Sequence, residues 1–224
     1  MTESPPLQAS RTRPDYPETP ARPVEDVLHG ERISDPYRWL ENGQSPETQG
    51  WTEQQNAFTE SYLAGFPGRE RIRARLEQLL TIGVLTAPTP ARGHYFYQRR
   101  EGKQNQPVLY WRAGYDGVDR VAVDPNALSA TGTTALDWYY PSEDGTLLAY
   151  GLSEDGSEQS VLHVLEVETG RLRDERISRT RAASLAWLPD NSGFYYTRYP
   201  APEAVPAGEE HYHRCIYFLS LIHI

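Results

Sequence analysis

The feature that most constrains the fold of this 224-residue chain is a unit of turn, strand, loop and strand that recurs between residues 86 and 218. Each copy opens with a proline and a glycine a few residues apart, and a run of aromatic or apolar residues follows the glycine. Such runs, bounded by Gly, Asp, Asn and Ser, predict short antiparallel strands. The recurring pairs are Pro90 with Gly93, Pro141 with Gly145, and Pro189 with Gly193.

The spacing of these units indicates two architectures. A period near 50 residues with about four short strands per unit is typical of β-propeller blades, and about three blades fit in this chain, too few to close a ring. An antiparallel sandwich with similar hairpins explains the pattern equally well, and the pattern leaves both open. We expect strands at His94–Gln98, Val108–Arg112, Arg120–Val123, Leu147–Gly151, Val161–Val167, Phe194–Arg198 and Cys215–Phe218.

A different pattern precedes the repeat. After an extended, turn-rich stretch, Ser45 can cap a helix whose first position suits Pro46, and Gly65 is a plausible stop. A second helix is expected at Arg69–Leu80, where apolar residues share a face. The aromatic residues of the first helix lie on one face at helical spacing, namely Trp51, Phe58 and Tyr62.

Composition excludes several classes of protein. The net charge of −9 argues against a broad nucleic-acid surface, which needs clustered Lys and Arg. The single cysteine excludes an internal disulfide framework and a Cys-based zinc site. No apolar run approaches the roughly 18 residues of a membrane span, and the proline-bearing start lacks the apolar core of a secretory signal. We therefore expect a cytoplasmic protein, with the periplasm as the alternative, and no membrane partner.

No residue qualifies as a nucleophile. Ser45 and Ser153 each have a glycine two positions before but none two positions after, so neither sits in a Gly-x-Ser-x-Gly elbow. The pattern favours a helix cap for the first and a hairpin turn for the second. Cys215 begins an apolar strand, where a buried structural thiol is the usual case.

Metal and acid–base sites are equally unsupported. His211 and His213 alternate on an expected strand and could face one side, but no third ligand stands at a suitable spacing. The adjacent acidic pairs belong to turns, where aspartate favours the local backbone geometry. These pairs are Glu143/Asp144, Glu154/Asp155 and Glu209/Glu210. No phosphate-binding glycine loop exists, so we assign no catalytic, cofactor-binding or metal residue and expect no cofactor.

Several short motifs nevertheless occur along the chain in the order in which a known family has them. Asp-Pro-Tyr-Arg-Trp-Leu-Glu at residues 35–41 and Trp-Thr-Glu-Gln-Gln-Asn at residues 51–56 are similar to the N-terminal segment of prolyl oligopeptidases. Further matches follow in the family's order, from about Tyr16 to Phe218. They are Asn105–Tyr110, Asp124–Ser129, Ser142–Gly145, Leu148–Ser153, Ala186–Trp187 and Gly193–Tyr196.

The resemblance implies a two-part serine peptidase. In that family a seven-bladed propeller covers an α/β-hydrolase domain and acts as a size-selecting lid, and short peptides are cleaved after proline. Serine, aspartate and histidine of the hydrolase domain perform the chemistry. None of these three positions exists in this sequence, so no catalytic residue is carried over. The resemblance implies that this chain is an N-terminal fragment, inactive alone, of a serine endopeptidase that is monomeric when intact.

The expected organisation has four parts. Residues 1–15 form a disordered lead-in, and residues 16–80 form an extended and helical segment that would pack on the missing C-terminal hydrolase domain. Residues 81–218 form a partial β-propeller of about three of seven blades, which makes the fold mainly β. Residues 219–224 match neither the family nor a blade ending, and we expect a truncation or frame artefact there.

Two other functions stay open. A propeller-like binding module without enzymatic activity is compatible with the lack of a catalytic constellation, but three blades leave exposed strands that need an oligomer or another cover. A propeller glycosidase needs two carboxylates that face each other across a funnel, and the acidic pairs in turns fit this poorly.

Overall fold

The computed structural model describes residues 14–222. The chain divides into two compact units, Met1–Leu76 and Glu77–Ile224. The division falls within one helix, α2, four residues before its last residue, Leu80. Within residues 14–222, no helix combines the length and apolar character that a bilayer crossing requires.

The first unit contains one hairpin and the predicted helices. Its elements are β1 (Val24–Leu28), β2 (Glu31–Asp35), the 3-10 turn η1 (Arg38–Glu41), α1 (Pro46–Ala64) and the start of α2 (Arg69–Leu80). The backbone amide of Thr48 donates to the Ser45 hydroxyl at 3.1 Å, which makes Ser45 the N-cap of α1. Both predicted helices are confirmed, because the cap of the first and the apolar spacing of the second act within a few residues. The hairpin β1–β2 was not predicted.

The aromatic face of α1 contacts the extended segment that precedes β1. The Trp51 indole donates to the Thr19 hydroxyl at 3.0 Å. The ring of Phe58 lies 5.3 Å from that of Tyr16, whereas Tyr62 stays more than half exposed. Among the described residues of this unit, Thr48 alone is buried. Hydrogen bonds and ring contacts at the surface therefore stabilise this unit more than a buried apolar core does.

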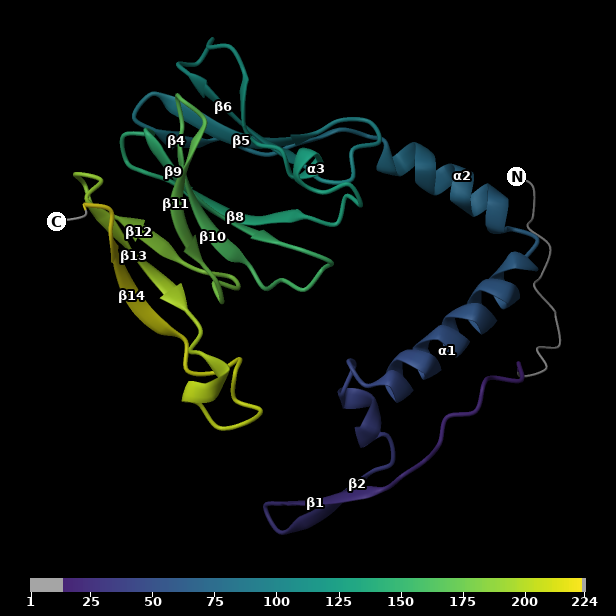
Figure 1. The fold of residues 1–224 in the computed structure, drawn as a ribbon. Helices are drawn as coiled ribbons and strands as arrows, with labels where there is room; N and C mark the ends of the chain where they lie inside the picture. The colour runs from purple at the N-terminus through teal and green to yellow at the C-terminus, as the bar shows by residue number, and fades with distance from the viewer. Residues whose placement is uncertain (1–13, 223–224) are drawn as a thin grey trace. The chain divides into compact units, whose positions relative to one another are not determined.

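The second unit consists of three antiparallel sheets that lie side by side (Figure 1). In each sheet consecutive strands are hydrogen-bonded neighbours, except that β3 and β4 both pair with β5. We call the sheets blades 1, 2 and 3. Blade 1 contains β3 (Val84–Leu85), β4 (Thr89–Ala91), β5 (His94–Arg100), β6 (Val108–Ala113) and β7 (Arg120–Val123); blade 2 contains β8 (Ala135–Pro141), β9 (Leu147–Ser153), β10 (Val161–Glu166) and β11 (Arg171–Ile177); blade 3 contains β12 (Leu185–Trp187), β13 (Gly193–Arg198) and β14 (Cys215–Ser220).

Two separate apolar layers join the blades. Phe96 and Trp111 of blade 1 pack in one cluster with Leu148 of blade 2. Leu162 on the other face of blade 2 packs with Phe194 of blade 3 in the second cluster. Because each layer lies between two neighbouring sheets, the arrangement is that of propeller blades, and the single-core sandwich is wrong. The prediction of a mainly β partial propeller is confirmed.

The repeated turns align differently from the alignment that the glycines indicated in the sequence. The backbone amide of Thr146 donates to the Asp144 carboxylate, and that of Ser192 donates to the Asp190 carboxylate in the same way. The left-handed residue between them is Gly145 in one turn and Asn191, with φ of 59°, in the other. Gly145 therefore corresponds to Asn191 and not to Gly193. Asparagine tolerates this conformation better than most residues, so the turn survives without the glycine.

The last strand, β14, is longer than the predicted Cys215–Phe218. The last strand continues past Phe218 to Ser220, with Leu219 opposite Phe194. Leu221 is buried in the cluster between blades 2 and 3. Cys215 is exposed, so its expected burial is wrong: it begins the outer edge strand of a three-stranded sheet.

Candidate functional site

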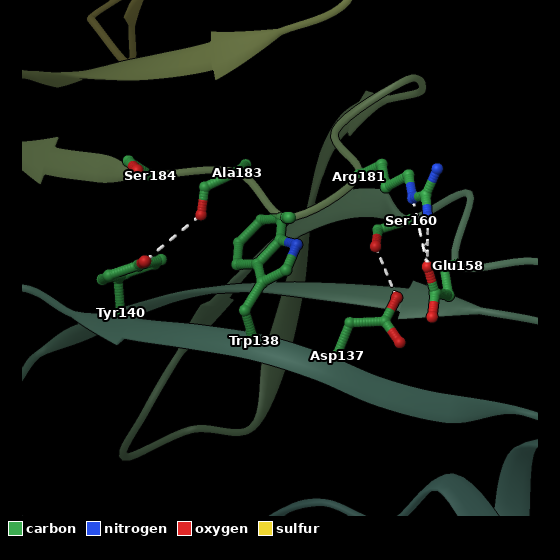
Figure 2. A pocket seen from close by; sticks show the side chains of 9 residues that line it. Asp137, Trp138, Tyr140, Glu158, Ser160, Arg181, Ala183 and Ser184 are labelled. Carbon is green, nitrogen blue, oxygen red and sulfur yellow. Dashed lines mark hydrogen bonds and ion pairs between the residues drawn. The ribbon is translucent and has the colours of Figure 1, made fainter. Parts of the chain in front are cut away.

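A cavity of about 480 Å³ opens between blades 2 and 3. Figure 2 shows the side chains around it, which come from β8, from the loop before β10 and from the segment that connects β11 to β12. The lining residues are Asp137, Trp138, Tyr140, Glu158, Ser160, Arg181, Ala182, Ala183 and Ser184. All lie within the second unit.

Two aromatic side chains of β8 fasten the connector to blade 2. The Trp138 indole donates to the carbonyl of Thr180 at 3.1 Å, and the Tyr140 hydroxyl donates to the carbonyl of Ala183 at 3.2 Å. Their rings lie 5.8 Å apart. Gly151 on β9 makes room for the indole, because a Cβ there would lie 2.3 Å from the Trp138 ring.

A carboxylate lies beside these rings. The pairing of β8 with β9 shifts register between Leu136 and Trp138, and Asp137 is the residue at this bulge. Its carboxylate accepts from the Ser153 hydroxyl at 2.9 Å and from the Ser160 hydroxyl. At the mouth, Arg181 donates to the Glu158 carboxylate at 3.1 Å. The charges of this pocket are therefore already engaged within the chain.

This arrangement suits binding or structure but not acyl transfer. Ser160 is fully buried and donates to a carboxylate, and no histidine is among the lining residues. A serine nucleophile needs a base that removes its proton and a third group that orients that base. The pocket can accommodate a flat or polar group against Trp138 and Tyr140, and it has no group poised to react with one.

A second polar cluster links blades 2 and 3 at the turn before β9. The Asn191 side-chain amide donates to the Asp144 carboxylate at 2.8 Å and to the Thr146 hydroxyl at 3.1 Å. Burial raises the pKa of Asp144, but hydrogen bonds from Asn191, Thr146 and Ser142 outweigh it and hold the pKa well below its usual range. This carboxylate is therefore ionised at neutral pH and stabilises the contact between the two turns.

The residues weighed from the sequence lie apart from the pocket. His211 and His213 lie in the loop before β14 and not on a strand, so their expected alternation is wrong. His213 contacts the Glu209 carboxylate at 2.5 Å. Within residues 14–222 no group of three or more His, Cys, Asp or Glu could hold a metal ion. His223 lies outside the described residues.

The pocket residues were missed by sequence reasoning. Asp137, Trp138 and Arg181 stand in no motif, and the bulge in β8 breaks the alternation that marks a strand. The one available signal was a cluster of aromatic residues, Trp138, Tyr139 and Tyr140, just before a turn.

Comparison with known proteins gives a consistent set of relatives. The model of the prolyl oligopeptidase N-terminal β-propeller domain matches residues 16–221. A prolyl endopeptidase of Elizabethkingia meningoseptica is 35% identical over 208 residues, which cover 92% of this chain and 29% of the relative. Prolyl oligopeptidase A of Amanita bisporigera is 32% identical over 198 residues, covering 78% of this chain and 26% of the relative.

Solved structures agree with the sequence relatives. A prolyl endopeptidase structure superimposes with a TM-score of 0.84 at 36% identity and covers 92% of this chain and 31% of that protein. Prolyl oligopeptidase B of Galerina marginata, bound to a 35-residue substrate, gives a TM-score of 0.73 at 24% identity, which supports the fold alone. The chain thus spans about 30% of the length of the relatives it matches. On the match of 206 residues to one domain model and on these relatives, the chain belongs to the prolyl oligopeptidase family and corresponds to the N-terminal β-propeller domain of its members.

Proposed function

We propose that this chain forms the first part of a propeller that restricts access to the hydrolase domain of a serine endopeptidase, which cleaves short peptides after proline. The observation that carries the proposal is the stack of three blades joined by separate apolar layers, over a segment that matches the family's propeller model. In this proposal the chemistry belongs to a hydrolase domain outside the chain. The intact protein is proposed to be a monomer that acts in the cytoplasm.

The proposal predicts that the 224-residue chain alone does not hydrolyse proline-containing peptides. A chromogenic peptide with proline before the scissile bond is the substrate, and the Elizabethkingia meningoseptica enzyme is the positive control. Turnover by the purified chain that a serine-directed inhibitor abolishes would contradict the proposal.

A chimera tests the lid role. The matching segment of the Elizabethkingia meningoseptica enzyme is replaced by residues 16–221 of this chain, and hydrolysis of a short peptide is compared with that of a long unfolded polypeptide. We expect the chimera to prefer the short peptide. The matched variant Trp138→Ala loosens the connector between blades 2 and 3, because it removes the bond to Thr180, and should reduce this preference. A chimera that cleaves both substrates equally well would refute the lid role.

A further inference from the structure

A second cavity of about 480 Å³ lies on the opposite side of blade 2, the side that faces blade 1. Three of its lining side chains form a row across the sheet. Tyr150 on β9 is directly opposite His163 on β10, and His163 is directly opposite Arg176 on β11. The imidazole stacks on the Tyr150 ring with centroids 5.4 Å apart. The row thus places a phenol, an imidazole and a guanidinium beside one cavity.

Two buried polar atoms in this cavity lack partners. His163 is 8% exposed and Thr134, in the loop after the short helix α3 (Pro125–Leu128), is 3% exposed. In the described part of the chain, His163 Nδ1 and Thr134 Oγ1 have no hydrogen-bond partner. Buried polar atoms in folded proteins are paired in the large majority of cases, because an unpaired one keeps its full desolvation cost. Both residues line the cavity, so a bound molecule can supply the missing partners.

The row of Tyr150, His163 and Arg176 carries one positive charge, which favours an anion beside it. Arg176 makes no ion pair with any residue in the range 14–222. Burial lowers the pKa of His163 and the charge of Arg176 lowers it further, so the imidazole is neutral at pH 7 and the guanidinium provides the positive charge. Glu154 is the one acidic lining residue; it is exposed, as Arg176 is, and it lies outside the row of Tyr150, His163 and Arg176.

Four apolar side chains line the cavity beside the polar residues Ser153, Ser157 and Gln159. Leu128 and Leu172 are 58% and 38% exposed, and Leu152 and Val161 complete this side. Exposed leucines around a cavity with unpaired donors indicate a ligand with an apolar body and a polar end. Inorganic anions would leave the leucines uncovered.

We propose that this cavity binds a small monocarboxylate with an apolar body. Its carboxylate accepts from the Arg176 guanidinium and from the Nδ1–H of His163, the residue directly opposite Arg176, and its body covers Leu128 and Leu172. A guanidinium recognises a carboxylate through charge-assisted hydrogen bonds, which are stronger than neutral ones. This site is separate from the pocket between blades 2 and 3, and the proposal does not depend on peptidase function.

Calorimetric titration of the 224-residue chain tests the site with three probes. Benzoate has both a carboxylate and an apolar body, benzamide lacks the charge, and inorganic phosphate lacks the apolar body. We expect saturable binding of benzoate that is about tenfold tighter than that of either other probe, the equivalent of one lost charge-assisted contact. Equal binding of benzamide or of phosphate would overturn the proposal.

Substitutions locate the binding. Arg176→Gln should weaken benzoate about tenfold, because it removes the counter-charge from an exposed position that the fold does not need. Arg171→Gln is the matched control: it removes the same charge from the same strand, but Arg171 pairs with Glu166 away from the cavity. If both variants bind alike, the assignment to Arg176 is wrong.

A further variant and a spectroscopic readout guard against misfolding. Leu172→Asp adds a negative charge at the exposed rim and should also abolish benzoate binding. The imidazole proton resonance of His163 is assigned by its absence from the spectrum of the His163→Gln variant. This resonance should shift when benzoate is added to the wild-type chain. An unshifted His163 resonance at saturating benzoate would place binding elsewhere and overturn the proposal.

Discussion

Asp144 illustrates how one side chain connects two blades. Its carboxylate accepts from Asn191 of the next turn and from three groups of its own turn. The equivalent aspartate of blade 3, Asp190, accepts from the amide and hydroxyl of Ser192 in the same manner. The hydrogen bonds within the turn therefore recur in blades 2 and 3. The bond from Asn191 to Asp144 joins the two turns.

Asp144→Ala should lower the free energy of unfolding by about 2 kcal/mol at pH 7, since a carboxylate with several hydrogen bonds is lost. The pKa of Asp144 in the folded chain is below its unfolded value near 3.9, so this contribution is complete above about pH 5 and is lost as the pH falls below about 4. Urea unfolding at pH 7 and pH 3 should show a smaller difference between variant and wild type at pH 3. Asp116→Ala, in an exposed turn, is the control.

Gly151 is required by the ring that it contacts. Gly151→Ala should lower the free energy of unfolding by roughly 2 kcal/mol, because the new methyl overlaps an indole that the bond to Thr180 holds in place. In a Trp138→Ala background the same change should have little effect, since the overlap is gone. Denaturant unfolding of the four proteins of this cycle measures the coupling. Equal costs in both backgrounds would show that the indole is not the cause.

At the scale of a single element, the stability of helix α1 depends on its N-cap and on a glycine within the helix. Ser45→Ala should lower the free energy of unfolding of this helical unit by about 1 kcal/mol, because the capping hydroxyl is lost. Gly50→Ala should raise it by about 1 kcal/mol, since Gly50 lies within the helix and a Cβ there meets nothing. Ellipticity at the helix band during heating measures both. Shifts of the same sign would be inconsistent with this account.

The elements also show what sequence patterns can and cannot provide. The two helices were predicted with their bounds, because caps and spacing act within a few residues. Strand β8 was missed because its bulge interrupts alternation, and β11 was missed because five of its seven residues are charged. The inter-blade pocket was out of reach for another reason: its residues come from three segments that only the packing of blades brings together.

The two units of the molecule differ in what stabilises them. Among described residues, the first unit buries only Thr48, whereas Phe96, Leu148 and Phe194 of the second unit are fully buried. Backbone hydrogen bonds in α1 should therefore open at a lower free energy than those in β9 and β10. Amide hydrogen exchange followed by mass spectrometry should show faster exchange in Pro46–Ala64 than in Leu147–Ser153. Equal protection would mean that the helical unit is as stable as the blades.

Blade 2 contributes to both apolar layers. On β10, Leu165 packs in the layer shared with blade 1, and its neighbour in sequence, Val164, packs on the opposite face in the layer shared with blade 3, as strand alternation requires. Within residues 14–222, blades 1 and 3 each contribute to one layer. Among these three blades the coupling is therefore between nearest neighbours, and separating blade 1 or blade 3 from blade 2 breaks a single described interface. A destabilising substitution in blade 2 weakens both of its interfaces with the neighbouring blades. The cost of a substitution therefore depends on which blade carries it as well as on how deeply the residue is buried.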